Sequence, residues 1–156
     1  MSLYSAIKRV FKSGEPDEEE AKAEKIGRVE SLESFLLVES GMRGSEEYEI
    51  TMEGERAVVR RYRIRYLGSD TERIPDGQGS VDSAAALEKL NSFRLGSWNG
   101  FHGPHPKFVR DGIMFRLEAQ VNGGRTLRAD GSENFPSGYT ELKSWIYAVL
   151  RNDEND

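Results

Sequence analysis

Residues 97–112 read SWNGFHGPHPKFVRDG, and residues 130–139 read DGSENFPSGY. In both stretches, aromatic side chains stand among glycine, proline and asparagine, on either side of an alternating segment. Glycine and proline impose special backbone angles, and large aromatic rings are usually buried. The pattern predicts loops of fixed shape, pinned by buried rings at one end of a sheet.

The segment between these loops is predicted to be a β-hairpin. Asn122-Gly123-Gly124 is typical of a tight turn, and apolar residues alternate with polar ones on both sides of it. The expected inner face consists of Ile113, Phe115, Leu117, Ala119, Val121, Leu127 and Ala129.

A second hairpin is predicted over residues 47–66, where apolar and charged residues also alternate. Keeping the apolar residues of both strands on one face requires a three-residue loop at 54–56. Met52 then lies opposite Val58, and the glutamates of the first strand face the arginines of the second.

Two helices are expected to cover the sheet. Asp82 is a suitable N-cap for a helix that ends near Gly96, and Ser137 is a candidate N-cap for a C-terminal helix. The apolar stripe of the second helix consists of Leu142, Trp145, Ile146, Val149 and Leu150.

Together with a short strand at 35–38, these elements predict an α+β domain over residues 28–156. Its antiparallel sheet has about five strands, one single strand and two hairpins, with two helices on one face. The glycine-rich and polar segment 68–79 is interpreted as a loop.

Residues 1–27 are expected to form an amphipathic helix at 3–12, with a basic face, and a charged linker. The helix is interpreted as packing on its own domain or on a second copy of the chain, which makes a homodimer one alternative. A membrane surface or another partner is the second interpretation of this helix.

The composition excludes several kinds of protein. The chain of 156 residues has no cysteine and a net charge of −5, which argues against disulfides, thiolate metal sites and general binding to nucleic acid or anionic membranes. A negative net charge does not exclude local basic patches on the surface. No transmembrane segment is predicted, and the N-terminus lacks the apolar region of a signal peptide. We therefore expect a cytoplasmic protein as the sequence stands, and a secreted one if a leader has been removed.

The loop with His102, His105 and Asp111 comes nearest to a metal or catalytic site. A zinc site needs at least three protein ligands, and these two histidines are the only ones in the chain. We therefore predict no metal and no cofactor, and interpret these residues as loop polar groups beside Trp98 and Phe101.

Two functional alternatives use this loop. A binding module would line a cleft with its candidate ligand-binding residues, Trp98, Phe101, His102, His105, Asp111 and Asn134. A small hydrolase or metal-dependent enzyme would use the two histidines with Asp111, but the G-x-S-x-G motif of many hydrolases is absent, and no catalytic residue is assigned.

Residues 33–151 resemble a widespread uncharacterised bacterial domain that is often found in secreted proteins or lipoproteins. The matching parts are Trp98-Asn99-Gly100-Phe101, Asp111-Gly112, the turn at 122–124, Gly131 to Pro136, and the final helix. The resemblance implies no activity and no catalytic residue.

The leading prediction is a non-enzymatic module that binds a protein or a small ligand. The enzyme is the first alternative, and a structural or oligomerising domain is the second.

Overall fold

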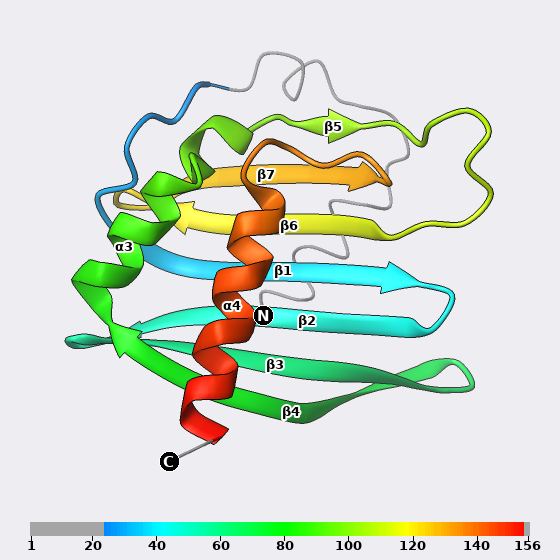
Figure 1. Ribbon diagram of the computed structural model, residues 1–156, viewed down its shortest axis with the longest axis horizontal. Helices are drawn as coiled ribbons and strands as arrows, with labels where there is room; N and C mark the ends of the chain where they lie inside the picture. The colour runs from blue at the N-terminus through cyan, green and yellow to red at the C-terminus, as the bar shows by residue number, and fades with distance from the viewer. Residues whose placement is uncertain (1–23, 155–156) are drawn as a thin grey trace.

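The computed structural model describes residues 24–154, which form a seven-stranded sheet with two helices on one face (Figure 1). The strands are β1 (Leu32–Gly41), β2 (Gly44–Glu53), β3 (Arg56–Leu67), β4 (Asp70–Asp82), β5 (His102–Gly103), β6 (Met114–Val121) and β7 (Arg125–Ser132). The helices are α3 (Ser83–Ser92), α4 (Tyr139–Glu154) and a short 3-10 helix, η1 (Leu95–Trp98).

The strands lie in the order β4-β3-β2-β1-β6-β7-β5. All neighbours are antiparallel except β5, which pairs in parallel with β7. The α+β class and the antiparallel sheet with two helices are confirmed, whereas the expectation of about five strands is wrong. The helix predicted at 3–12 and most of the charged linker lie outside the described residues.

The β6–β7 hairpin forms as predicted, except that Ile113, expected on its inner face, precedes β6 and is 45% exposed. Residues 122–124 make the turn, and all three have positive φ. Phe115, Leu117 and Leu127 on its inner face are almost completely buried against the helices. Because one face of this hairpin is apolar and fully covered, its alternation determines both the strands and their orientation.

Helix α4 covers the sheet with its predicted apolar stripe, of which Trp145 alone is only partly buried. The helix lies very close to β4, because a Cβ placed on Gly79 would lie 2.2 Å from the carbonyl oxygen of Val149. The shorter helix α3 begins as predicted, with the carboxylate of Asp82 accepting a hydrogen bond of 3.0 Å from the Ala85 amide.

The register of the β2–β3 hairpin differs from the prediction by one residue. Glu53 pairs with Arg56, so that the turn contains only two residues, with Gly54 at a φ of 64°. Met52 therefore lies opposite Ala57 instead of Val58. The consecutive valines at 58 and 59 allow either face to be the inner one, and the glycine turn selects Val59.

The segment predicted as a loop at 68–79 is most of strand β4. This strand is at the edge of the sheet and pairs only with β3, so residues that suit the centre of a sheet poorly are tolerated. Pro75 lies beside a register shift between Arg60 and Tyr62, where the regular pairing is interrupted. Glycine is required at position 79 because the backbone of α4 leaves no room for a side chain.

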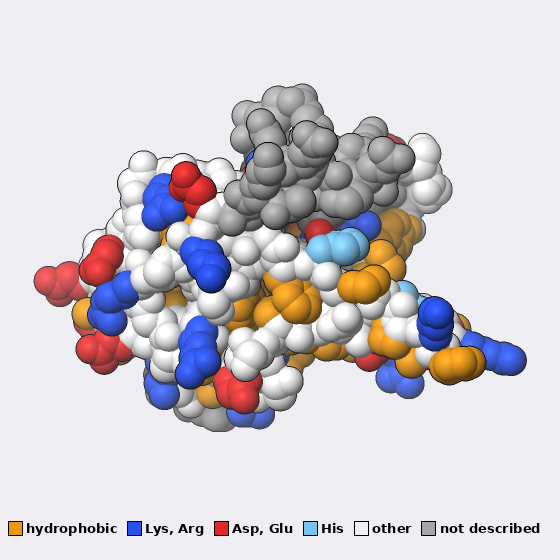
Figure 2. All heavy atoms as spheres, turned by 90° about the horizontal axis from the view of Figure 1, so that it is seen from above, with side chains coloured by type: hydrophobic (Ala, Val, Ile, Leu, Met, Phe, Trp, Pro, Cys, Tyr) orange, Lys and Arg blue, Asp and Glu red, His pale blue; other side chains and the backbone are white. Residues whose placement is uncertain are grey.

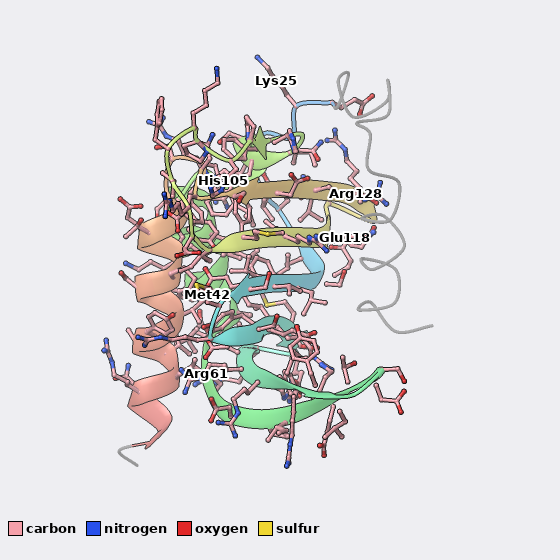
Figure 3. The ribbon with its side chains drawn as sticks, turned by 90° about the vertical axis from the view of Figure 1, so that its right-hand side faces the viewer. Lys25, Met42, Arg61, His105, Glu118 and Arg128 are labelled. Carbon is pink, nitrogen blue, oxygen red and sulfur yellow. The ribbon has the colours of Figure 1, made fainter. Side chains whose placement is uncertain are left out.

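Two carboxylates are buried on the face of the sheet opposite the helices. Desolvation raises the pKa of Glu47, and the nearby Arg73 partly offsets this effect. Desolvation likewise raises the pKa of Glu118, against a weaker opposing effect of Arg128, whose Nη2 lies 3.8 Å from a Glu118 oxygen (Figure 3). This outer face is therefore an ionic network rather than the fully hydrated surface that alternation predicts.

Trp98 joins the loop after α3 to the start of α4. Its ring is 1% exposed, and its Nε1 donates a hydrogen bond of 2.9 Å to the Ser137 carbonyl oxygen. The ring also packs on Tyr139, with a centroid separation of 5.8 Å, and Tyr139 in turn contacts Phe115 and Phe135. Trp98 thus belongs to the core at one end of the sheet.

Replacing Trp98 by alanine should lower the free energy of unfolding by about 3 to 5 kcal/mol, because it removes a large buried ring and leaves the Ser137 carbonyl without its donor. Urea unfolding followed by circular dichroism measures the loss. Trp145→Ala is the matched control: its ring is only partly buried beside Phe93, and a clearly smaller loss is expected. Equal losses for the two variants would show that Trp98 has no special structural role.

Candidate functional site

Two of the predicted ligand-binding residues are structural. Trp98 is enclosed in the core, as described above, and has no face available to a ligand. Phe101 is partly buried and stacks on Phe115, with ring centroids 6.2 Å apart. The aromatic rings of the loop therefore hold the sheet end together and do not line a cleft.

The two histidines contact different residues of the same strand, β7. Strand β5 pairs with β7, which brings the Nδ1 of His102 to 2.5 Å from a carboxylate oxygen of Asp130. His105 lies further along, with its Nδ1 2.7 Å from the Ser132 hydroxyl and its Nε2 on the Val109 carbonyl oxygen. The structure thus forms two separate pairs rather than one histidine site.

The remaining two predicted residues are also apart. Asp111 is exposed and makes no hydrogen bond or ion pair within residues 24–154. Asn134 donates a long hydrogen bond of 3.4 Å to the Pro104 carbonyl oxygen, and its backbone oxygen occupies the space beside Gly131. Within the described part of the chain, no three histidine or acidic side chains are grouped as metal ligands.

A polar cluster that the sequence analysis missed lies between α4 and the inner face of the sheet. Glu39 on β1 is its centre, with one carboxylate oxygen 2.8 Å from the Lys143 ammonium nitrogen and the other accepting a hydrogen bond from the Tyr139 hydroxyl. Only 9% of the Lys143 side chain is exposed. A buried charge of this kind is tolerated because it is paired and hydrogen-bonded.

The next strand completes this cluster. Glu46 lies directly opposite Glu39 and accepts a hydrogen bond of 2.5 Å from the Tyr48 hydroxyl. The Lys143 nitrogen lies 3.6 Å from the centroid of the Tyr48 ring and 4.7 Å from that of Tyr147. The ammonium group therefore rests on two aromatic faces as well as on a carboxylate.

Burial raises the pKa of the Tyr48 phenol, and its hydrogen bond to Glu46 adds to the effect. Burial also raises the pKa of Tyr139, which is increased further by the negative charge of Glu39. Both phenols therefore stay protonated at neutral pH and donate to the two carboxylates. The hydrogen bonds from Tyr139, Lys143 and Tyr48 therefore hold Glu39 and Glu46 in place, and neither phenol loses its proton at neutral pH.

A pocket of about 400 Å³ opens beside the β1–β2 turn, and both carboxylates reach it. Its walls come from the end of the β1–β2 hairpin, from β3 and from the segment that precedes β6; Met42 marks this turn in Figure 3. The side chains that line it include Glu39, Met42, Arg43, Glu46, Arg63, Asp111 and Ile113. Asp111 is thus the one predicted site residue that lines this pocket.

Two sequence signals point to the cluster. Tyr139, Lys143 and Tyr147 recur at every fourth position and so share one side of α4. Glu39 continues the inward-facing positions of Phe35 and Leu37 on β1. Each of these two elements thus has a charged residue at a position where the sequence pattern predicts burial. Such residues are expected to form buried ion pairs, but the pattern does not show which two elements pack together.

Comparison with protein-family models, with curated proteins and with solved structures found no match for this chain. The resemblance to a bacterial domain therefore stays a prediction. No helix within residues 24–154 is long and apolar enough to span a membrane.

The two buried phenols predict how stability changes at alkaline pH. In the unfolded chain these phenols have the ordinary tyrosine pKa of about 10, whereas burial raises their pKa in the folded protein, which keeps them protonated. Their contribution is thus complete below about pH 10 and falls above it, by about 1.4 kcal/mol per pH unit for each phenol. Denaturant unfolding at a series of pH values from about 9 to 11 measures this slope.

Tyr139→Phe should reduce the slope by the share of one phenol, whatever its effect on stability at neutral pH. Tyr66→Phe is the control, because Tyr66 is 59% exposed at the end of β3. A slope that is the same in Tyr139→Phe and in the unmodified protein would contradict the assignment.

Proposed function

We propose that this protein is a ligand-binding module and that its binding site is the pocket beside the β1–β2 turn. The observation that carries the proposal is a pocket of about 400 Å³ with apolar walls and two carboxylates at its base. This volume lies in the range of small-molecule sites, which combine apolar walls with a few fixed polar groups.

The lining indicates an amphiphilic organic ligand. Met42 and Ile113 offer apolar contact, and both side chains are exposed without a ligand. Arg43 and Arg63 supply guanidinium groups that make no ion pair within residues 24–154. Asp111 supplies a carboxylate that is equally unpaired. A small molecule with an apolar body and polar groups of both charge signs is the best match to these side chains.

The two carboxylates of the pocket, Glu39 and Glu46, are preorganised. Because Glu39 is held by Lys143 and Tyr139, its position does not change when a ligand arrives. Glu46 is held in the same way by Tyr48, through one oxygen only. A binding site that is already ordered avoids the entropic cost of ordering these side chains on binding.

Titration with the fluorescent amphiphile 1-anilinonaphthalene-8-sulfonate tests this site, since the probe joins an apolar ring system to a charged group. Native protein should bind it saturably with one-to-one stoichiometry. Ile113→Ser should weaken binding at least tenfold, because about 1.4 kcal/mol of apolar contact with the probe is lost.

Leu67→Ser is the matched control, since Leu67 is similarly exposed at the same end of the molecule and does not line the pocket. It should bind the probe as native protein does. Equal binding by both variants, or no saturable binding to native protein, would remove the pocket as the binding site.

The contact between His105 and Ser132 supports a second candidate, a small hydrolase. The His105 Nε2 must donate to the Val109 carbonyl oxygen, so the neutral ring has Nδ1 free to accept from the Ser132 hydroxyl at 2.7 Å. This is the pairing of a serine nucleophile with its base, with a backbone carbonyl orienting the imidazole. Asp111 takes no part in this arrangement.

A fluorophosphonate probe, which phosphonylates activated serines, tests this candidate by peptide mass spectrometry. For a hydrolase, the expected result is modification of Ser132 in native protein that disappears in His105→Gln. Serines without a histidine partner, such as Ser80, serve as internal controls. An unmodified Ser132 at long reaction times would eliminate the hydrolase.

A further inference from the structure

The exposed hydrophobic side chains of the described residues are not scattered over the surface. All of the large ones lie at the ends of strands or in connections on one side of the molecule, on the right in Figure 1. They are Met42 in the β1–β2 turn, Tyr66 and Leu67 beside the β3–β4 turn, and Phe108, Val109, Ile113 and Met114 in or next to the loop before β6. Such a concentration marks an interaction surface, here named the loop end.

Phe108 is the most prominent side chain of the loop end. It is fully exposed, at 102% of the reference area, and its φ is 78°, a region that bulky residues rarely adopt. The base of its loop is fixed, since His105 contacts both Ser132 and Val109, and the Ile113 amide donates a 2.7 Å hydrogen bond to Glu133. An aromatic ring held in an unfavourable backbone conformation, with no packing in return, indicates a functional constraint.

The basic side chains beside these residues are unpaired. Arg43, Lys107 and Arg110 make no ion pair within residues 24–154, and the unpaired carboxylates at this end are Asp111 and, opposite Leu67, Asp70. By contrast, arginines elsewhere on the sheet are neutralised, such as Arg73, which is 2.6 Å from Glu47. Figure 2 shows Lys and Arg side chains beside hydrophobic ones at the right-hand end of the molecule.

We propose that the loop end docks onto the surface of an anionic lipid membrane. Phe108 and Met42 would enter the interfacial layer, while Arg43, Lys107 and Arg110 bind the anionic headgroups. Aromatic and apolar side chains combined with basic ones are the features that hold proteins at such surfaces. Met42 and Arg43 also line the pocket, whereas Lys107, Phe108 and Arg110 do not, so variants at these last three residues test docking independently of the proposed ligand site.

The shape of the loop end favours a lipid surface over a protein partner. The hydrophobic residues lie in or beside three separate connections and not along one strand face. A lipid interface adapts to such projections, whereas a protein partner would need a matching hollow for each. The net charge of −5 does not oppose docking, because charges further away than about 8–10 Å are largely screened at physiological salt.

Co-sedimentation with vesicles tests the proposal. The protein should bind vesicles of equimolar phosphatidylcholine and phosphatidylglycerol, bind pure phosphatidylcholine vesicles far less, and dissociate as salt is added. The double variant Lys107→Gln/Arg110→Gln should bind about 30-fold more weakly, since each basic residue at an anionic surface contributes about fivefold. Phe108→Ser should also bind more weakly while unfolding at the same temperature, because its ring is fully exposed.

Lys89→Gln/Arg94→Gln is the matched control, since it removes two exposed positive charges that make no ion pair within residues 24–154. They lie in and after helix α3, on the other side of the molecule from the loop end. This variant should bind the anionic vesicles as native protein does. Equal losses in the two double variants would show a response to total charge alone and would overturn the proposal. Absence of binding to anionic vesicles, or self-association through Phe108 in its place, would overturn it as well.

Discussion

Helix α4 crosses the inner face of the sheet so closely that its Val149 carbonyl oxygen would lie 2.2 Å from a side chain at position 79. Burial of the apolar stripe of α4 drives this approach, and the glycine on β4 permits it. The same placement of α4 on the sheet brings Tyr139 and Lys143 into contact with Glu39. The packing of this one helix therefore forms both the core and the polar cluster. The position of Glu39, which lines the pocket, therefore follows from the packing of α4 on the sheet.

The sequence predicts those parts of the fold in which one face alone can be buried. The β6–β7 hairpin and α4 satisfy this condition, and both form as expected. The register of β2 and β3 does not follow, because adjacent valines suit either face, and β4 is missed because Pro75 and its glycines are typical of loops. The spacing of Lys143 and Glu39 on their own elements indicates that each is buried, but the two residues are 104 positions apart, so spacing does not show that they pair with each other.

Paired and unpaired charges lie on different parts of the described surface. On the sheet, Arg60 lies 3.0 Å from Glu53, and Arg73 contacts both Glu47 and Glu49. These pairs lower the cost of charges that lie close together on neighbouring strands. At the loop end, guanidinium and ammonium groups stand beside exposed apolar side chains with no such partner. Among the described residues, the loop end thus has charges without ion-pair partners and apolar side chains without packing partners, and both are free to contact another surface.

Strand β4 has a further consequence for the behaviour of this protein in concentrated solution. The outer edge of an open sheet presents backbone groups to which a strand of another molecule can add. Here that edge is interrupted by Pro75, which has no amide hydrogen, and by Gly77 at a φ of 136°. The opposite edge is β5, which is only two residues long. Neither side provides a long uninterrupted template, so the fold resists growth into extended intermolecular sheets.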